Sequence, residues 1–272
     1  MNQNIIKSSI SETAKKVIER YSSLPLPIPV KCPYYNNRRG KIRGGLRALV
    51  GKGTPEEIVE EALLLALRKK INFKELDAEM MTKFLVDHSL GVDCSGFVYH
   101  VLDAEFKAKT GHHLRTRLTL AKDRNFLRKI FAKLRPAENA NVREFAKDIN
   151  STLVQIPDVS AGDIITMTHN NPDDRAYDHI LLVTSVETVP PGTTPSSSPT
   201  SQNIFKIKYS HSIAWPEDGK YNHGISGGTI TITDPSSPLP SALWEEKDVP
   251  ESQNRTKSRA LACSKCEIRR IK

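Results

Sequence analysis

Cys94 stands in a sequence that could support nucleophilic chemistry. It lies in Gly91-Val92-Asp93-Cys94-Ser95-Gly96-Phe97-Val98, where turn-forming residues precede an apolar stretch that is typical of a helix. Unpaired N–H groups and the dipole at the start of a helix stabilise an anion, so a cysteine there is biased toward its thiolate. Because a thiolate needs a nearby imidazole to become a useful catalyst, the histidines that follow are its candidate partners.

Two of these histidines lie in segments that are rich in β-branched and apolar residues. His179 opens the run His179-Ile180-Leu181-Leu182-Val183, and His211 stands in Tyr209-Ser210-His211-Ser212. The ordered set Cys94, His179 and His211 is therefore the candidate catalytic constellation.

The elements that must position this set are predicted as helices before residue 150 and strands after it. A short amphipathic helix begins near Ser9 or Ser11, and Thr54-Pro55-Glu56-Glu57 is a strong start for a second helix. The spacing of Leu76, Met80, Phe84 and Leu85 predicts a third helix whose apolar side chains lie in the core. Further helices are expected over 94–108, around 126–134 and over 141–149, and strands over 153–156, 163–167, 179–183, 204–209 and 228–233. Successive strands separated by turns indicate an antiparallel sheet, and hence an α+β protein.

Five motifs follow one another in an order that is known from one enzyme family. They are Asp93-Cys94-Ser95-Gly96-Phe97-Val98, Val159-Ser160-Ala161-Gly162-Asp163, His179-Ile180-Leu181-Leu182-Val183, His211-Ser212 and Gly224-Ile225-Ser226-Gly227-Gly228. In this order they resemble the NlpC/P60 family of cell-wall cysteine peptidases, over residues 91–105 and 153–234. The resemblance implies a papain-like fold in which the catalytic helix packs on an antiparallel sheet.

The resemblance also implies a role for each residue of the site. Cys94 attacks a carbonyl and forms a thioester, and its own N–H is one oxyanion donor. His179 pairs with the thiolate and later protonates the leaving amine, while His211 orients the imidazole. Asp178, His169 and His223 are alternatives for the orienting role. Asp93 and Ser95 are expected to contact the substrate.

One family feature is displaced in this chain. Members place a Pro-Tyr segment shortly before the cysteine, and its Tyr helps to bind the oxyanion. The nearest match here, Pro33-Tyr34-Tyr35, precedes Cys94 by about sixty residues and two predicted helices. Either the helical pair is an insertion and Tyr35 binds substrate, or the Tyr role is lost.

The expected organisation has three parts. Residues 1–88 form an N-terminal helical and basic region, and residues 89–236 form the catalytic core. The core carries a helical insertion over about 109–150 and a Pro- and Ser-rich loop over about 188–203. Residues 237–272 form a C-terminal tail.

By resemblance the function is hydrolysis of amide bonds in bacterial peptidoglycan stem peptides, next to a D-glutamyl residue. Two alternatives remain open. The first is an acyltransferase or amidase on the same scaffold, because thioester chemistry also serves other acceptors. The second is a non-catalytic module that binds wall polymer or nucleic acid through residues 31–52.

Charge motivates that second alternative. Residues 1–52 hold eleven Lys/Arg and two Asp/Glu, which accounts for the whole net charge of +9. The cluster of Arg38, Arg39, Lys41, Arg43, Arg47 and Lys52 stands among glycines, so an exposed loop that attracts polyanions is expected.

Cofactors and membrane spans are not indicated. Cys263-Ser264-Lys265-Cys266 is half of a zinc site by spacing, but no second pair of ligands accompanies it, so an inert thiol pair is the expectation. The glycine-rich run 44–54 lacks the residues of a phosphate-binding loop. No apolar stretch reaches about 20 residues, and no secretory signal is recognised, which favours the cytoplasm while leaving export by another route open.

Overall fold

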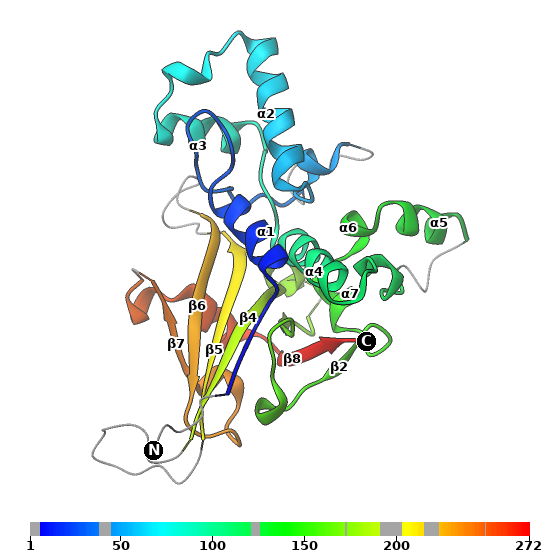
Figure 1. Ribbon diagram of the computed structural model, residues 1–272, viewed down its shortest axis with the longest axis vertical. Helices are drawn as coiled ribbons and strands as arrows, with labels where there is room; N and C mark the ends of the chain where they lie inside the picture. The colour runs from blue at the N-terminus through cyan, green and yellow to red at the C-terminus, as the bar shows by residue number, and fades with distance from the viewer. Residues whose placement is uncertain are drawn as a thin grey trace. The chain divides into compact units, whose positions relative to one another are not determined.

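The computed structural model describes residues 6–37, 45–120, 126–171, 173–190, 203–214, 223–247 and 249–272 (Figure 1). The chain divides into two compact units. Unit 1 comprises Met1–Ile10, Val142–Ser210 and Gly227–Lys272, and unit 2 comprises Ser11–Asn141 and His211–Ser226.

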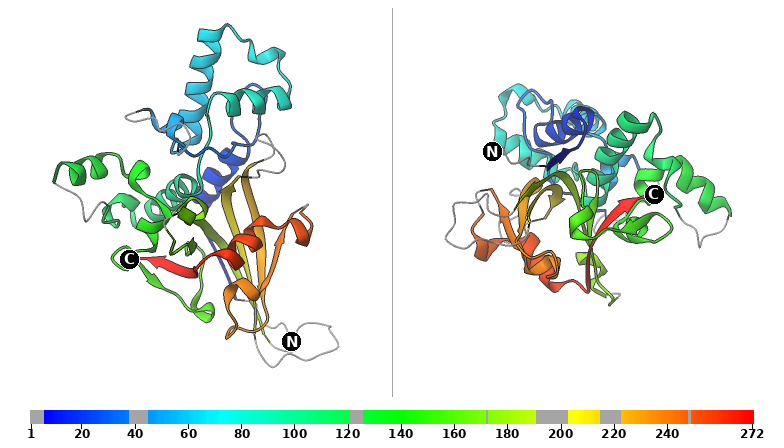
Figure 2. Two further views of the ribbon diagram at one scale, coloured as in Figure 1. Left: turned by 180° about the vertical axis from the view of Figure 1, so that it is seen from behind. Right: turned by 60° about the horizontal axis from the view of Figure 1, so that its bottom comes forward.

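An antiparallel sheet dominates unit 1. In the described residues the eight strands of the sheet are β1 (Ile6–Ser9), β2 (Ser151–Leu153), β3 (Ile164–Thr168), β4 (His179–Val189), β5 (Ile204–Ile213), β6 (Gly224–Ile232), β7 (Leu243–Glu246) and β8 (Lys265–Ile271). The end of β5, from His211, and the start of β6, up to Ser226, are assigned to unit 2. The strand order is β2-β8-β3-β4-β5-β6-β7, and β1 pairs with β4 (Figures 1 and 2). The predicted α+β class and the antiparallel sheet are confirmed, and four of the five predicted strands match β3, β4, β5 and β6. The fifth, 153–156, is wrong except at Leu153, because β2 ends there and Ile156–Asp158 form a short 3-10 helix.

The long strand β4 pairs with both β3 and β1 along the same edge, at different residues. Its first residues pair with β3, with Met167 opposite His179, and its later residues pair with β1, with Ser9 opposite Ser185. The β-branched and leucine-rich start of β4 is fully buried and joins the apolar core of this unit. His179 is thus the first residue of a well-anchored central strand.

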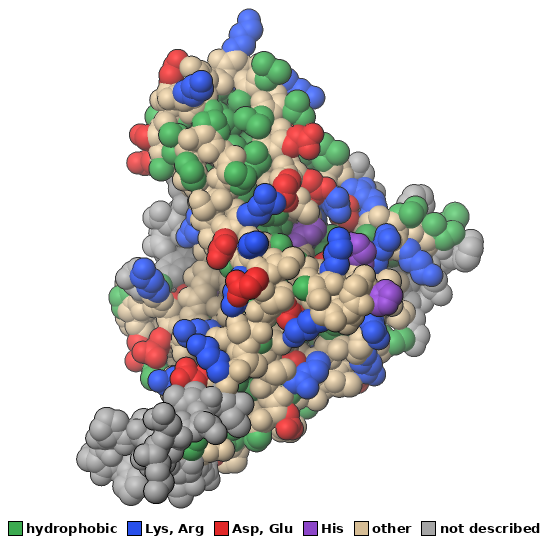
Figure 3. All heavy atoms as spheres, in the orientation of Figure 1, with side chains coloured by type: hydrophobic (Ala, Val, Ile, Leu, Met, Phe, Trp, Pro, Cys, Tyr) green, Lys and Arg blue, Asp and Glu red, His purple; other side chains and the backbone are tan. Residues whose placement is uncertain are grey.

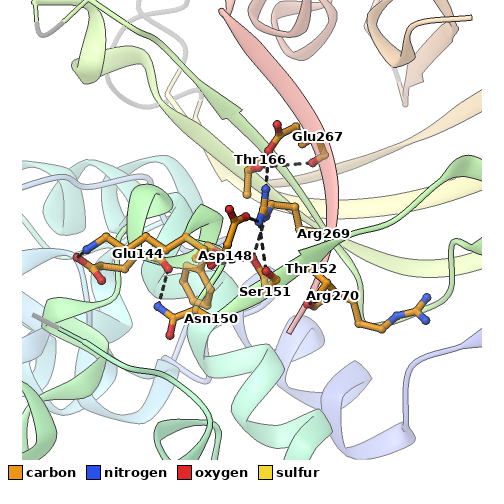
Figure 4. A network of polar contacts seen from close by, with 11 residues as sticks. Glu144, Asp148, Asn150, Ser151, Thr152, Thr166, Glu267, Arg269 and Arg270 are labelled. Carbon is orange, nitrogen blue, oxygen red and sulfur yellow. Dashed lines mark hydrogen bonds and ion pairs between the residues drawn. The ribbon is translucent and has the colours of Figure 1, made fainter. Parts of the chain in front are cut away.

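Strand β8 pairs with β2 and β3 through ladder hydrogen bonds, and a buried arginine adds further bonds on the β2 side (Figures 2 and 4). Arg269, only 4% exposed, donates to Ser151 Oγ at 2.8 Å and to Glu267 at 2.7 Å, and also reaches Asp148. Such a planar fork satisfies several acceptors at once, which is what a buried guanidinium needs.

Unit 2 is mainly helical. It contains α1 (Glu12–Ser22), α2 (Pro55–Lys69), α3 (Ala78–Asp87), α4 (Cys94–Thr110), α5 (Phe126–Leu134) and α6 (Pro136–Asn139), whereas α7 (Val142–Ala146) and α8 (Arg255–Ala262) belong to unit 1. Helix α2 begins where it was expected, after Thr54, and the structure adds a capping box in which Thr54 and Glu57 bond one another's backbone N–H groups. Helix α1 packs against α4, where the rings of Tyr21 and Phe97 meet edge to face with centroids 5.5 Å apart.

Three local expectations differ from the structure. Helix α1 starts after Ser11, which is one of the two starts that the sequence predicts. The residues around the other, Ile6–Ser9, form strand β1 instead. The segment 237–272, expected as a tail, contributes β7, α8 and β8. Strand β4 extends to Val189, into the expected loop 188–203, of which residues 191–202 lie outside the described residues.

The expected core of the third helix is only partly buried. Phe84 and Leu85 are buried, but Leu76 is half-buried and Met80 is 50% exposed. Leu63, Leu64 and Leu67 of α2 are also exposed. Figure 3 shows apolar side chains gathered at the top of the view, where Figure 1 draws α2 and α3. Among the described helices, none is long and apolar enough to cross a membrane.

Candidate functional site

Cys94 is the first residue of α4, and backbone hydrogen bonds to two other segments of unit 2 fix the residues before it. Val92 donates its N–H to Pro33 O at 3.0 Å, and Tyr35 donates its N–H to Val92 O at 3.4 Å. The N–H of Asp93 bonds Gly51 O at 2.9 Å. The Pro33-Tyr34-Tyr35 segment, sixty residues away in sequence, therefore lies directly beside the residues that lead into Cys94. This arrangement favours the insertion alternative, since α2 and α3 lie between two chain segments that meet at Val92.

Two glycines of the Cys94 motif are required by close backbone contacts. A Cβ on Gly91 would lie 2.5 Å from Pro33 O, and a Cβ on Gly96 would lie 2.8 Å from Gly51 O. Both distances are below any ordinary contact, so a larger side chain would force these segments apart. The glycines explain how the start of α4 packs so closely on its neighbours.

A buried ion pair fixes the N-terminus of α4. Asp93 is the N-cap, and its Oδ1 accepts from Gly96 N–H at 2.6 Å and from Ser95 Oγ at 3.1 Å. Lys52 Nζ donates to the same Oδ1 at 2.9 Å, to Ser95 Oγ at 2.6 Å and to Ala140 O at 3.1 Å. The Asp93 and Ser95 side chains, expected to contact substrate, are thus engaged with Lys52, and all three residues are less than 10% exposed.

The prediction that Lys52 lies in an exposed basic loop is therefore wrong, because Lys52 is buried. Its ammonium is drawn inside because a carboxylate, a hydroxyl and a carbonyl together replace water around it. Arg47 forms an ion pair with Glu57 of α2. The other members of the basic cluster, Arg38, Arg39, Lys41 and Arg43, lie outside the described residues.

His211 also belongs to unit 2 and is completely buried on β5. Its neighbour Ser212 donates its hydroxyl to Val92 O at 2.7 Å, so this end of β5 is tied to the segment that precedes Cys94. Side chains alternate along a strand, so His211 points to the face opposite Ser212. The structure thus groups Cys94, Tyr35 and His211 within one unit.

His179 belongs to unit 1 and is 1% exposed. The residue before it, Asp178, is occupied by other partners: Arg143 Nε donates to it at 2.7 Å and the His169 N–H at 2.9 Å. His169 Nδ1 also lies 3.3 Å from this carboxylate. Asp178 and His169, two of the alternative orienting groups, therefore bond each other. Arg143 was not singled out from the sequence, where it is an ordinary charge on a short helix.

His223, the third alternative, lies beside the Tyr34 ring in unit 2, with ring centroids 6.2 Å apart. Burial, together with the charge of Lys31, lowers the pKa of His223 to about 4. Its Nε2 is buried without a hydrogen-bond partner in the described part of the chain. A neutral imidazole is thus present at neutral pH next to the Pro33-Tyr34-Tyr35 segment.

The described part of unit 2 also contains a cavity of about 600 Å³ near the start of α2. Glu57, Glu60, Glu61 and Glu138 line it, along with Arg47 and Arg135 and several apolar groups. Cys94 is not among the lining residues. Within the described ranges, no cluster of three or more His, Cys, Asp or Glu could hold a metal ion.

Comparisons with models of protein families, with curated proteins and with solved structures found no match to this chain.

Proposed function

We propose that the protein is a cysteine hydrolase of papain-like, NlpC/P60 type, with Cys94 as its nucleophile. The observation that carries the proposal is the way the start of α4 is held. Asp93, Ser95, Gly91 and Gly96 each have a structural partner that fixes the first turn of the helix around the cysteine. A preorganised helix start offers the thiol the positive end of the helix dipole.

The position of Tyr35 supports the same proposal. The resemblance calls for a Tyr close to the nucleophile, and the backbone of Tyr35 bonds Val92, two residues before Cys94. In the proposal Tyr35 binds the substrate near its oxyanion. Asp93 and Ser95 act by holding the helix start rather than by touching substrate, because Lys52 engages both side chains.

The base and the orienting residue are assigned from the order of motifs in the sequence. His179 takes the thiol proton and returns it to the leaving amine, and His211 orients the imidazole. The substrate class is a peptidoglycan stem peptide with a D-glutamyl residue, processed in the cytoplasm as part of wall recycling. Acyl transfer to an acceptor other than water remains the nearest variant of this chemistry.

The test is the alkylation rate of each cysteine by iodoacetamide at several pH values, read by mass spectrometry in wild type and His179→Ala. Cys94 is expected to react faster than Cys32, although both are buried, and to lose that advantage in His179→Ala. Cys32 is the matched control because burial raises the pKa of its thiol. Equal rates at the two cysteines would contradict the proposal.

A second assay addresses the substrate. Wild-type protein should release the amine from a stem peptide that contains D-glutamate, and Cys94→Ser should not. The same peptide with L-glutamate is the control for stereochemistry. If Cys94 is reactive but neither peptide is cleaved, transfer to an amine acceptor is the next reaction to assay. If Cys94 is unreactive and the protein binds nucleic acid with a steep salt dependence, the binding-module alternative replaces the enzyme.

A further inference from the structure

Two neighbouring cysteines, Cys263 and Cys266, lie in unit 1 and take no part in the proposed hydrolase site. Cys263 is the C-cap of α8, and Cys266 is the second residue of β8. Only Ser264 and Lys265 separate them, and both cysteines are free and half-buried.

The turn between the two cysteines is anchored to β3. Ser264 donates its N–H to Thr168 O at 2.9 Å, and its Oγ accepts from Asn170 N–H at 3.0 Å. Cys266 stands opposite Met167 in the β3–β8 ladder. At the other end, the N–H of Cys263 closes α8 on Arg259 O at 3.0 Å. Backbone contacts on both sides therefore hold the two side chains in one geometry.

The side chains of the two cysteines are hydrogen-bonded to each other, and Cys263 Sγ also lies 3.3 Å from Ala260 O. The hydrogen bond from Cys266 lowers the pKa of Cys263. The same bond, together with burial, raises the pKa of Cys266. This asymmetry is what a thiol pair needs when one member attacks first and the other resolves the product.

We propose that Cys263 and Cys266 form a dithiol–disulfide pair that exchanges with small disulfides. Both thiols are half-buried, which favours a small co-reactant over a protein disulfide. Oxidised glutathione is a disulfide of this kind.

The reaction proceeds in two balanced exchanges. The Cys263 thiolate attacks one sulfur of R–S–S–R, which forms the mixed disulfide Cys263–S–S–R and releases RS⁻. The Cys266 thiol then loses its proton and attacks the Cys263 sulfur, which forms the Cys263–Cys266 bond and releases the second RS⁻. The two cysteines are oxidised by two electrons, and R–S–S–R is reduced to two thiols after RS⁻ takes up protons.

The experiment treats the full chain, in a Cys94→Ser background, with oxidised glutathione and maps the products by mass spectrometry. The Cys94→Ser background makes the result independent of the proposed hydrolase. The expected product lacks two hydrogen atoms and carries one disulfide, between Cys263 and Cys266.

Single variants separate the two roles. Cys266→Ser should accumulate glutathione on Cys263, since no thiol remains to resolve the adduct. Cys263→Ser should acquire glutathione on Cys266 more slowly by about tenfold or more. The proposal is overturned if the Cys94→Ser protein itself, with both cysteines present, accumulates glutathione adducts without the internal disulfide. It is also overturned if Cys32 is modified as fast as Cys263.

Discussion

Replacing Lys52 by Met should destabilise the protein far more than an ordinary surface lysine would. The side chain of Lys52 is 9% exposed and that of its partner Asp93 is 10% exposed. Met keeps most of the aliphatic volume but removes all three hydrogen bonds of the ammonium. Asp93 then remains as a buried charge with only Gly96 N–H and the Ser95 hydroxyl as donors.

The size of the effect follows from that uncompensated charge. Removing one partner of a buried ion pair costs about 3–5 kcal/mol in free energy of unfolding. We expect the lower end, about 3 kcal/mol, because two donors to Asp93 are retained. The matched control is Lys15→Met, since Lys15 bonds Glu12 at 2.6 Å on the surface of α1 and their side chains are 39% and 80% exposed. That change should cost about 1 kcal/mol or less.

Urea unfolding followed by far-UV circular dichroism measures both variants. A double variant, Lys52→Met with Asp93→Asn, sharpens the test. Asn keeps an N-cap oxygen for Gly96 N–H but removes the stranded charge. It should therefore recover about 1–3 kcal/mol of the loss. The reasoning is refuted if Lys52→Met costs no more than Lys15→Met, or if the double variant is as unstable as the sum of its parts.

Three further outcomes are expected. Gly96→Ala should lower the free energy of unfolding by about 1–3 kcal/mol in urea titrations, despite the better helix propensity of Ala, because its Cβ meets Gly51 O. His223 should titrate near pH 4 by NMR. Since its folded pKa lies below the unfolded value of about 6.5, its contribution to stability is complete above pH 6.5 and lost as the pH falls toward 4. Wild type should therefore lose more stability between pH 7 and 4.5 than His223→Asn, and equal losses would contradict this. Arg269→Met should lower the free energy of unfolding by about 3 kcal/mol, because Glu267 and Ser151 each lose their hydrogen bond to the guanidinium. An unchanged thermal midpoint would contradict the network in Figure 4.

Local sequence signals were sufficient wherever an element's own residues determine it. Thr54-Pro55-Glu56-Glu57 contains every part of a helix start, and β3 and the beginning of β4 are β-branched or leucine-rich runs. The position of Cys94 at the first residue of α4 was predictable for the same reason, since Asp93 is a strong N-cap.

The missed features depend on partners that are distant in sequence. Strand β8 contains Lys, Cys, Glu and two arginines, which is not the composition of a typical strand. Arg269 is buried in it because Ser151, 118 residues earlier, accepts one of its hydrogen bonds. Lys52 is buried because it bonds Asp93 and Ala140 O. These partners lie 41 and 88 residues away in the sequence, so no local pattern around Lys52 indicates them. Strand β1 has four residues and no alternation that could distinguish it from a helix start.

The position of β8 between β2 and β3 also matters while the chain is being synthesised. Both neighbours emerge from the ribosome some hundred residues before β8 does, so each presents an open backbone edge until the strand arrives. A nascent chain that has reached only β7 has most of its sheet but lacks the strand that joins β2 to the rest. Unit 1 is therefore expected to complete its sheet late in translation, and pausing before β8 exposes edges that favour aggregation.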